Sequence, residues 1–245
     1  MNNKVIAIIL GRKGSKGLRD KNTMNILGEP SFNYSFAAAK ESKYIDKIFV
    51  SSDHTEILKS ANKEGFITIN RPKELCTDSA LFEDALVHAY YEAKKVTMHK
   101  PSYVVVLMCN SVTINANLID TGIELLEKNC MADSAVTTTI LNMYSPLRAR
   151  RLNDEGFLDP FVPFEVFGNP KTLNCDRDSQ GDVYFADMSH TVCRAKCIEN
   201  IDSGLLPQKW MGGKILPIPN QNGCDIDEPW QIDMSKRWLK ANNLS

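Results

Sequence analysis

Short apolar runs alternate along this chain with longer stretches of helical period, and no other feature constrains the fold as strongly. Residues 5–10 (VIAIIL) are apolar throughout, and residues 102–109 (SYVVVLMC) form the most apolar run of all. A strand that is covered on both faces loses the alternation of a half-exposed strand, so such runs are typical of central strands in a parallel sheet. The sequence therefore predicts an α/β fold, with a mainly parallel, Rossmann-like sheet flanked by helices.

The same periodicities place the individual elements. Further strands are expected at residues 47–53, 66–69, 134–141, 181–189 and 213–219, and helices at residues 31–42, 55–64, 80–95, 115–128 and about 229–242. Residues 144–181 differ, because they are rich in Pro, Asn, Asp and Arg, have no sustained period and are too many for a simple loop. We expect one domain over residues 1–245, with a dimerisation insertion at about 144–181.

Composition narrows the class of protein. An apolar share of 43% and a charged share of 24% are ordinary for a soluble globular protein. The formal net charge of -1 gives no overall attraction to nucleic acid or to anionic membranes. No apolar run approaches the ~20 residues of a membrane helix, and the N-terminus shows no signal-peptide core. We therefore expect a cytoplasmic protein with no nucleic-acid or membrane partner.

Cysteine usage gives no sign of a disulfide framework. The chain has seven cysteines, an odd number, scattered without CxxC pairs, which fits a reducing compartment. The nearest approach to a metal cluster is His190, Cys193 and Cys197, but a structural zinc site needs four ligands and no second pair is evident. We interpret these three as small, semi-buried residues on a helix.

A glycine-rich basic loop follows the first apolar run. Residues 11–22 (GRKGSKGLRDKN) contain three glycines and five basic side chains. They are expected beyond the carboxyl end of a strand, where open parallel sheets bind ligands. Glycines let backbone N–H groups approach a phosphate, and Arg12, Lys16 and Lys21 can neutralise a polyphosphate. The spacing fits neither a Walker A loop nor the GxGxxG dinucleotide fingerprint, so the loop indicates an anion site of another kind.

This loop resembles the N-terminal signature of the acylneuraminate cytidylyltransferases, or CMP-sialic acid synthetases, whose usual form is close to ARGGSKGIPxKN. Three further segments resemble the same family in the same order: residues 48–66 (IFVSSDHTEILKSANKEGF), 71–80 (RPKELCTDSA) and 224–232 (CDIDEPWQI). The resemblance runs over most of the chain. It implies a nucleotidyltransferase fold and the transfer of a cytidylyl group from CTP to the anomeric hydroxyl of a 2-keto-3-deoxy sugar acid, with Mg²⁺ and release of pyrophosphate.

The resemblance also assigns roles to residues. It implies that Arg12, Lys16 and Lys21 are the catalytic cations, because transfer at phosphorus is accelerated mainly by positioning and by stabilising charge on phosphate oxygens. The loop would hold the triphosphate, while Arg71 and the backbone of residues 78–80 would frame the cytidine. The residues implied for nucleotide binding are Leu10, Gly11, Arg12, Gly14, Ser15, Lys21, Asn22, Arg71, Asp78, Ser79, Ala80 and Ser111.

Asp225 and Asp227 form a second constellation. In an extended Asp-Ile-Asp segment the two carboxylates point to the same side, so both can reach one Mg²⁺, which takes oxygen ligands and keeps several waters. The alternative is a plain turn and helix start, in which an aspartate caps the helix before Pro229. Together with the basic loop, the pair favours a magnesium site.

The acceptor half of the chain departs from the family pattern. Where the family has LQPTSPLR, residues 107–114 read LMCNSVTI, so Met108 replaces the glutamine that faces the sugar acid. Where the family has RPNGAIY, the chain offers Arg177, displaced by one position and flanked by acids. The residues expected to bind the acceptor are Met108, Asn110, Arg177 and Gln180, with Arg148, Arg150 and Arg151 either as further cations or as a plain solvated face. We therefore expect an acceptor other than ordinary N-acetylneuraminate.

Three interpretations remain open at this point. The first is a Mg²⁺-dependent cytidylyltransferase, expected to be a homodimer, that acts on CTP and a small anionic acceptor such as a nonulosonic or ulosonic acid, or a phosphonate. The second is the same fold with another nucleotide. The third is a nucleotide-binding regulator without catalysis, against which the complete set of Lys21, Asp225 and Asp227 counts.

Overall fold

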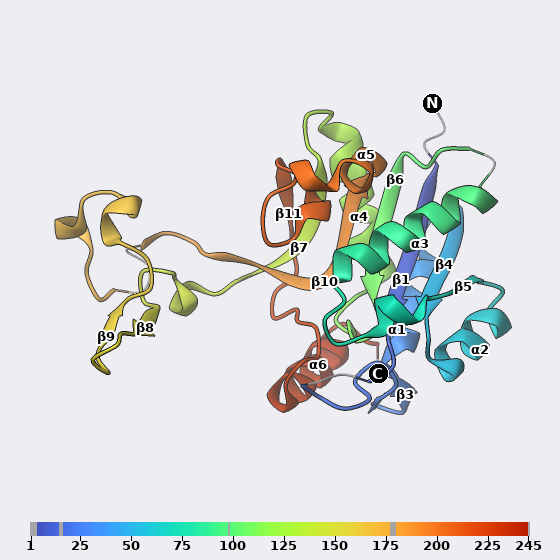
Figure 1. The fold of residues 1–245 in the computed structure, drawn as a ribbon, viewed down its shortest axis with the longest axis horizontal. Coiled ribbons are helices and arrows are strands. Elements are labelled where there is room, and N and C mark those ends of the chain that lie inside the picture. The colour runs from blue at the N-terminus through green and yellow to red at the C-terminus, as the bar shows by residue number, and fades with distance from the viewer. Residues whose placement is uncertain (1–3, 15–16, 98, 177–179, 245) are drawn as a thin grey trace.

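The chain folds around a seven-stranded sheet in the computed structural model, which describes residues 4–14, 17–97, 99–176 and 180–244 (Figure 1). The strands of this sheet are β1 (Val5–Gly11), β4 (Lys47–Ser52), β5 (Ile67–Asn70), β6 (Tyr103–Met108), β7 (Ser134–Ile140), β10 (Tyr184–Arg194) and β11 (Ile215–Pro219). Their spatial order is β11-β7-β10-β6-β1-β4-β5, and only β10 runs antiparallel to its neighbours. The predicted mainly parallel sheet is confirmed.

Helices cover both faces of the sheet. They are α1 (Ser31–Glu41), α2 (Thr55–Lys63), α3 (Phe82–Val96), α4 (Ala116–Lys128) and α5 (Ala195–Glu199), whereas α6 (Pro229–Ala241) packs in a separate cluster. Because side chains alternate along a strand, residues 5, 7 and 9 of β1 pack in one cluster with α1, α2 and α4, and residues 6, 8 and 10 pack in another with α3 and α5. Every residue of β1 is buried, which explains why its sequence shows no alternation.

Most predicted boundaries lie within two residues of the observed ones, and β10 is the exception. It was expected at residues 181–189 but spans Tyr184–Arg194. His190 and Cys193, expected on a helix, therefore lie on a strand, and of the three only Cys197 is helical, in α5. The helical expectation was wrong because β10 is paired with β6 and β7 on either side, so that even its polar side chains are buried.

Residues 141–176 and 180–183 leave the sheet as an arm between β7 and β10 (Figure 1). At its base the N–H of Leu141 donates to the carbonyl of Val183 at 3.0 Å, and the N–H of Val183 donates to Asn142 Oδ1 at 2.9 Å. The arm carries a short antiparallel hairpin of β8 (Arg150–Leu152) and β9 (Leu158–Pro160). It includes residues 144–181, whose part in dimerisation stays a prediction.

Helix α6 packs beside the segment that follows β1, at the carboxyl edge of the sheet (Figure 1). Trp238 and Leu239 of α6 pack in a separate apolar cluster with Ile226 and with Ile26, which belongs to the small hairpin of β2 (Asn25–Ile26) and β3 (Glu29–Pro30). This packing places the segment before α6 beside the loop that follows β1.

Two further observations bear on the expectations from composition. All seven cysteines are free thiols. Of the helices that the described residues form, none is both long enough and apolar enough to cross a membrane.

Candidate active site

A cleft opens where neighbouring parallel strands end. β1, β4 and β6 end side by side, because Leu10 pairs with Ser51 on one side and with Met108 on the other. The cleft has a volume of about 160 Å³. It is lined by Leu10, Gly11, Arg12, Lys21, Asn22, Arg71, Leu75, Ala80, Leu81, Phe82, Ala85, Met108 and Asn110. Most of these are predicted site residues, which the fold brings together from three separate segments of the chain.

The glycines of the loop after β1 are required by its geometry. A Cβ on Gly11 would lie 2.5 Å from Cys109 Sγ, so no side chain fits between β1 and the end of β6. Gly14 has a φ of +70°, a left-handed conformation that favours glycine. A Cβ on Gly17 would lie 3.2 Å from the carbonyl oxygen of Asp227. The loop therefore runs close against the segment that carries the two predicted metal ligands.

Arg12 and Asn22 fix the shape of this loop. Arg12 Nη1 lies 3.0 Å from Asp78 Oδ1, which joins the loop to the segment predicted to frame the cytidine. The buried side chain of Asn22 donates from Nδ2 to the Arg12 carbonyl at 2.9 Å. Asn22 thus holds the backbone of Arg12 at the cleft.

Arg71 reaches the cleft directly after β5. Its Nη2 donates to the Ser51 carbonyl at 2.9 Å, and Nε lies 3.4 Å from Ser51 Oγ. Burial lowers the pKa of Arg71. A guanidinium has five N–H donors, so these contacts leave the Nη1 group for a ligand. Ala80 lines the same cleft, whereas Ser79 is exposed.

Two carboxylates from near the C-terminus complete the site. Asp227 Oδ1 forms an ion pair with Lys21 Nζ. Asn110 Nδ2 lies 3.4 Å from Asp225 Oδ2 and 3.4 Å from Asp227 Oδ1, so both carboxylates approach a side chain two positions beyond the end of β6. Burial first, and then the neighbouring Asp227 carboxylate, raise the pKa of Asp225 to about 6. The predicted metal pair is therefore assembled beside the basic loop.

The donor set fits a magnesium ion that is shared with phosphate. Within the described ranges, no three His, Cys, Asp or Glu side chains are grouped so that they could hold a metal ion. Mg²⁺ is usually held by one or two carboxylates together with substrate phosphates and water, so a larger protein cage is not required. Asp225 and Asp227 supply such a pair, and Asp227 already attracts one cation, the Lys21 ammonium.

Several predicted site residues lie elsewhere. Ser111 is fully buried and its hydroxyl donates to the Met188 carbonyl at 2.8 Å, so this side chain is engaged away from the cleft rather than with a nucleotide. Gln180 lies in the arm, where its Nε2 donates to the Asn174 carbonyl at 3.4 Å. It does not line the cleft of the same chain. Ser15, Lys16 and Arg177 lie outside the described residues.

Sequence reasoning missed an apolar wall of the cleft. Leu75, Leu81, Phe82 and Ala85 form this wall. A signal existed, because Phe82 and Ala85 are spaced three residues apart in the first turn of a predicted helix and so share one face. Phe82 is held in place by Trp210, with ring centroids 4.9 Å apart.

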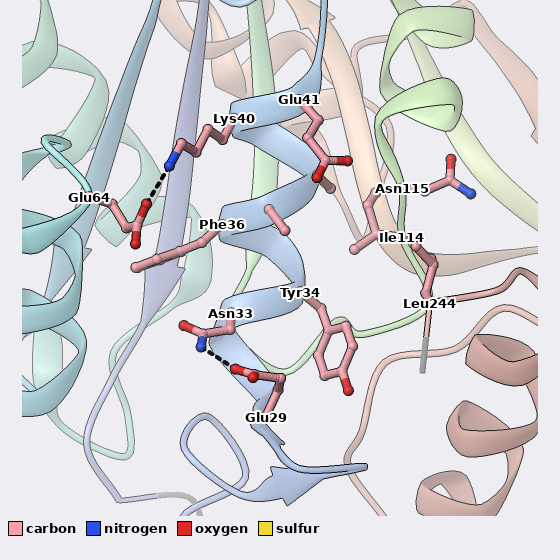
Figure 2. A pocket seen from close by; sticks show the side chains of 12 residues that line it. Glu29, Asn33, Tyr34, Phe36, Lys40, Glu41, Glu64, Ile114, Asn115 and Leu244 are labelled. Carbon is pink, nitrogen blue, oxygen red and sulfur yellow. Dashed lines mark hydrogen bonds and ion pairs between the residues drawn. The ribbon is translucent and has the colours of Figure 1, made fainter.

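A larger pocket, of about 670 Å³, lies along the exposed face of α1 (Figure 2). Its lining includes Tyr34, Phe36 and Lys40. Figure 2 shows Lys40 turned toward Glu64, and Lys40 Nζ lies 2.7 Å from Glu64 Oε2. None of the predicted site residues lines this pocket, so the smaller cleft at the strand ends is the candidate active site.

The fold and the cleft define a class of protein: an α/β protein in which a basic, glycine-rich strand end faces a pair of carboxylates. A family model described as cytidylyltransferase matches residues 6–154. The chain belongs to this cytidylyltransferase family, and its resemblance to the CMP-sialic acid synthetases is confirmed.

Curated relatives differ in how much of each chain is matched. The N-acylneuraminate cytidylyltransferase of Escherichia coli O18:K1:H7 is 38% identical over 89 residues, which are 36% of this chain and 21% of that protein. The pseudaminic acid cytidylyltransferase of Campylobacter jejuni is 26% identical over 243 residues, which are 99% of each chain. This chain spans 21%, 29% and 21% of the lengths of the first three curated relatives that it matches.

Solved structures share the fold. A CMP:2-keto-3-deoxy-manno-octonic acid synthetase complexed with CTP superposes with a TM-score of 0.67 at 14% identity, over 99% of this chain and 100% of that chain. A 4-diphosphocytidyl-2C-methyl-D-erythritol synthase from Anaerococcus prevotii gives 0.64 at 15% identity, over 98% and 97%. At these identities the likeness shows the fold alone, and it confirms the predicted nucleotidyltransferase sheet.

Proposed function

We propose that this protein transfers a cytidylyl group from CTP to a hydroxyl of a small anionic acceptor, a 2-keto-3-deoxy sugar acid, with Mg²⁺ and release of pyrophosphate. The observation that carries the proposal is the meeting of Lys21 with the Asp225–Asp227 pair at one cleft. Binding a nucleotide requires cations for its phosphates, whereas a metal-dependent transfer also requires carboxylates facing them. Relatives named for N-acylneuraminate and pseudaminic acid support a sugar acid as the acceptor.

In the proposed reaction the acceptor hydroxyl oxygen attacks the α-phosphorus of CTP. The bond from that phosphorus to the oxygen bridging to the β-phosphate breaks, pyrophosphate leaves with the electron pair, and the hydroxyl proton passes to water. Arg12 and Lys21 hold the triphosphate and stabilise the charge that builds on its oxygens. Asp225 and Asp227 would hold Mg²⁺, which when bound neutralises phosphate charge and orients the leaving group.

The residues expected to face the acceptor bear on which sugar acid the cleft can take. Met108 lines the cleft at the end of β6, where the family pattern has a glutamine. A thioether accepts hydrogen bonds only weakly and donates none, so the bonds that an amide makes to an acceptor are lost. Asn110, two residues further, is already engaged with both carboxylates. We infer an acceptor that differs from N-acetylneuraminate in the groups that face Met108.

We also propose that the protein is a homodimer formed through the arm. The large apolar side chains there that are more than half exposed include Leu152, Phe157, Leu158, Phe161 and Val166. Large apolar surface exposed on a soluble protein marks a contact with another molecule. Light scattering on a size-exclusion column tests the proposal, and a chain with Leu158→Asp and Phe161→Asp should be monomeric where the wild type is dimeric.

The test of the activity is pyrophosphate release with each of the four nucleoside triphosphates, with and without Mg²⁺, against 2-keto-3-deoxy sugar acids and small phosphonates. Release is expected with CTP and one sugar acid, and Asp227→Asn should abolish it. Asp233→Asn is the matched control, because Asp233 is an exposed carboxylate on α6 outside the cleft. If CTP raises the melting temperature but no acceptor reacts, the nucleotide site stands and the sugar-acid acceptor of the proposal is refuted for the acids tested. If CTP does not bind, the proposal fails.

A further inference from the structure

A buried network of hydroxyl, amide and indole groups lies beside the Asp225–Asp227 segment, and the proposed reaction gives it no role. Its members are Thr113, Ser189, Asn220 and Trp238, each at most 5% exposed. They come from four places in the chain: the segment after β6, strand β10, the turn after β11 and helix α6. Such convergence of polar groups in an apolar setting is costly unless every donor has an acceptor.

The Thr113 hydroxyl contacts both backbone polar groups of Cys224. Its Oγ1 donates to the Cys224 carbonyl at 2.8 Å and accepts from the Cys224 N–H at 2.9 Å. The Cys224 carbonyl belongs to the peptide unit that leads into Asp225. The hydroxyl of Thr113 therefore fixes the orientation of the chain at the point where the first carboxylate branches off.

The direction of each hydrogen bond follows from the donors. Trp238 Nε1 can only donate and lies 2.9 Å from Asn220 Oδ1, so the Asn220 amide nitrogen faces the other way. That nitrogen donates to Ser189 Oγ at 3.2 Å and to the Thr113 carbonyl at 3.1 Å. Ser189 Oγ lies 2.7 Å from Thr113 Oγ1 and must be the donor, because the single Thr113 proton goes to the Cys224 carbonyl. The Thr113 hydroxyl thus has one orientation.

Asn110 holds the segment at a second point. The N–H of Ile226 donates to the Asn110 carbonyl at 3.1 Å, and Asn110 Nδ2 donates to the Ile226 carbonyl at 3.0 Å. Asp225 therefore lies between two anchored residues, Cys224 and Ile226, and both anchors come from the short segment that follows β6.

We propose that Thr113 is a positioning residue for the carboxylate pair, which acts through the backbone of Cys224 to set the direction of Asp225. This inference rests on the proposed function, because it takes Asp225 and Asp227 as the metal ligands. Groups that orient metal ligands change metal affinity even where they do not touch the ion. Thr113→Val keeps the shape of the side chain but leaves the Cys224 N–H and carbonyl without a partner from this residue.

Thr137 offers a matched control. It is also fully buried, and its Oγ1 accepts from the His190 N–H at 3.1 Å and donates to the His190 carbonyl at 3.2 Å. This is the same two-sided contact to a backbone, but it joins β7 to β10 instead of reaching the carboxylate segment. Thr137→Val should therefore cost stability without changing metal affinity.

The test is the dissociation constant of Mn²⁺ for the full chain without nucleotide, measured from the electron paramagnetic resonance signal of free Mn²⁺. Thr113→Val should raise this constant about tenfold, Thr113→Ser should restore wild-type affinity, and Thr137→Val should keep it. If Thr113→Val does not fold, Ser189→Ala, which removes the hydroxyl that contacts Thr113 and accepts from Asn220, should weaken Mn²⁺ binding in the same direction.

Two outcomes overturn the inference in distinguishable ways. Equal Mn²⁺ affinities in Thr113→Val and Thr137→Val, whether both match the wild type or both are weakened, would show that Thr113 contributes only to general stability. A wild type that binds Mn²⁺ no more tightly than Asp227→Asn would instead refute the metal site of the proposed function itself.

Discussion

Replacing His190 with leucine should make the fold less sensitive to acid. The ring lies on β10 and is 2% exposed, and its burial outweighs the one contact that favours the imidazolium, from the backbone of Leu118. The ring lies against Gly122 of α4, where a Cβ would be 3.5 Å from Nε2. Burial lowers the pKa of His190 to about 3, because the charged imidazolium is poorly solvated in this position. Leucine has a similar volume and no polar atom.

The magnitude follows from the difference between the folded and unfolded pKa of this residue. In the unfolded chain a histidine titrates near pH 6.5, so the unfolded state takes up a proton at a pH where the folded state does not. The stability that depends on the neutral ring is therefore present above about pH 6.5 and is lost as the pH falls toward 3. At about pH 5 the loss is about 2 kcal/mol, from about 1.5 pH units at about 1.4 kcal/mol each.

Urea unfolding followed by tryptophan fluorescence, at about pH 7.5 and about pH 5, measures this loss. Carboxylates contribute to the pH dependence of both chains, and their contributions cancel in the difference. His190→Leu should lose about 2 kcal/mol less than the wild type between the two pH values. His99→Leu, at an exposed position, is the control and should follow the wild type. Equal pH dependence in His190→Leu and the wild type would refute the reasoning.

Three further substitutions test other contacts. Gly11→Ala places a methyl group 2.5 Å from Cys109 Sγ, so urea unfolding should show a loss of about 1–3 kcal/mol, partly recovered on adding Cys109→Ala. If the free energy of unfolding of Gly11→Ala equals that of the wild type, the close packing at Cys109 is contradicted. Lys21→Met removes an ammonium from the cleft, so CTP should no longer raise the melting temperature, while the circular dichroism spectrum stays that of the wild type; an unchanged CTP shift would count against the site. Tyr90→Phe removes a 2.9 Å hydrogen bond to Glu199 and should cost about 1 kcal/mol in urea unfolding. No loss would mean that water replaces the bond.

Much of the sheet could be predicted because its central strands are apolar on both faces. β1 and β6 appear in the sequence as uninterrupted apolar runs. Residues 189–193 of β10 are also buried, but they include Ser189, His190 and Thr191, which are polar. Partners for the first two come from residues 76 and 53 positions away, such as Thr113 and Thr137. A local sequence pattern cannot indicate partners so far away in the chain. The sequence therefore predicts a helix for His190 and Cys193, which lie on a strand.

The candidate site was predictable in its residue types but not in its contacts. The motifs identified Arg12, Lys21 and the aspartate pair, yet Lys21 and Asp227 are 206 positions apart and meet only because α6 packs beside the loop after β1. Ser111 shows the opposite case. It follows a strand that ends at the cleft, but the chain turns there and its hydroxyl contacts Met188 instead. The direction of a side chain beyond the end of a strand depends on tertiary packing.

Lys21 and Asp227 are each other's counterions in this structure. In the proposed reaction a triphosphate would compete with Asp227 for the ammonium, and a divalent cation would compete with Lys21 for the carboxylate. Each ligand that takes one member of the pair thus releases the other member for the second ligand. Nucleotide and metal are therefore expected to bind cooperatively, and by linkage the gain in affinity is the same in both directions.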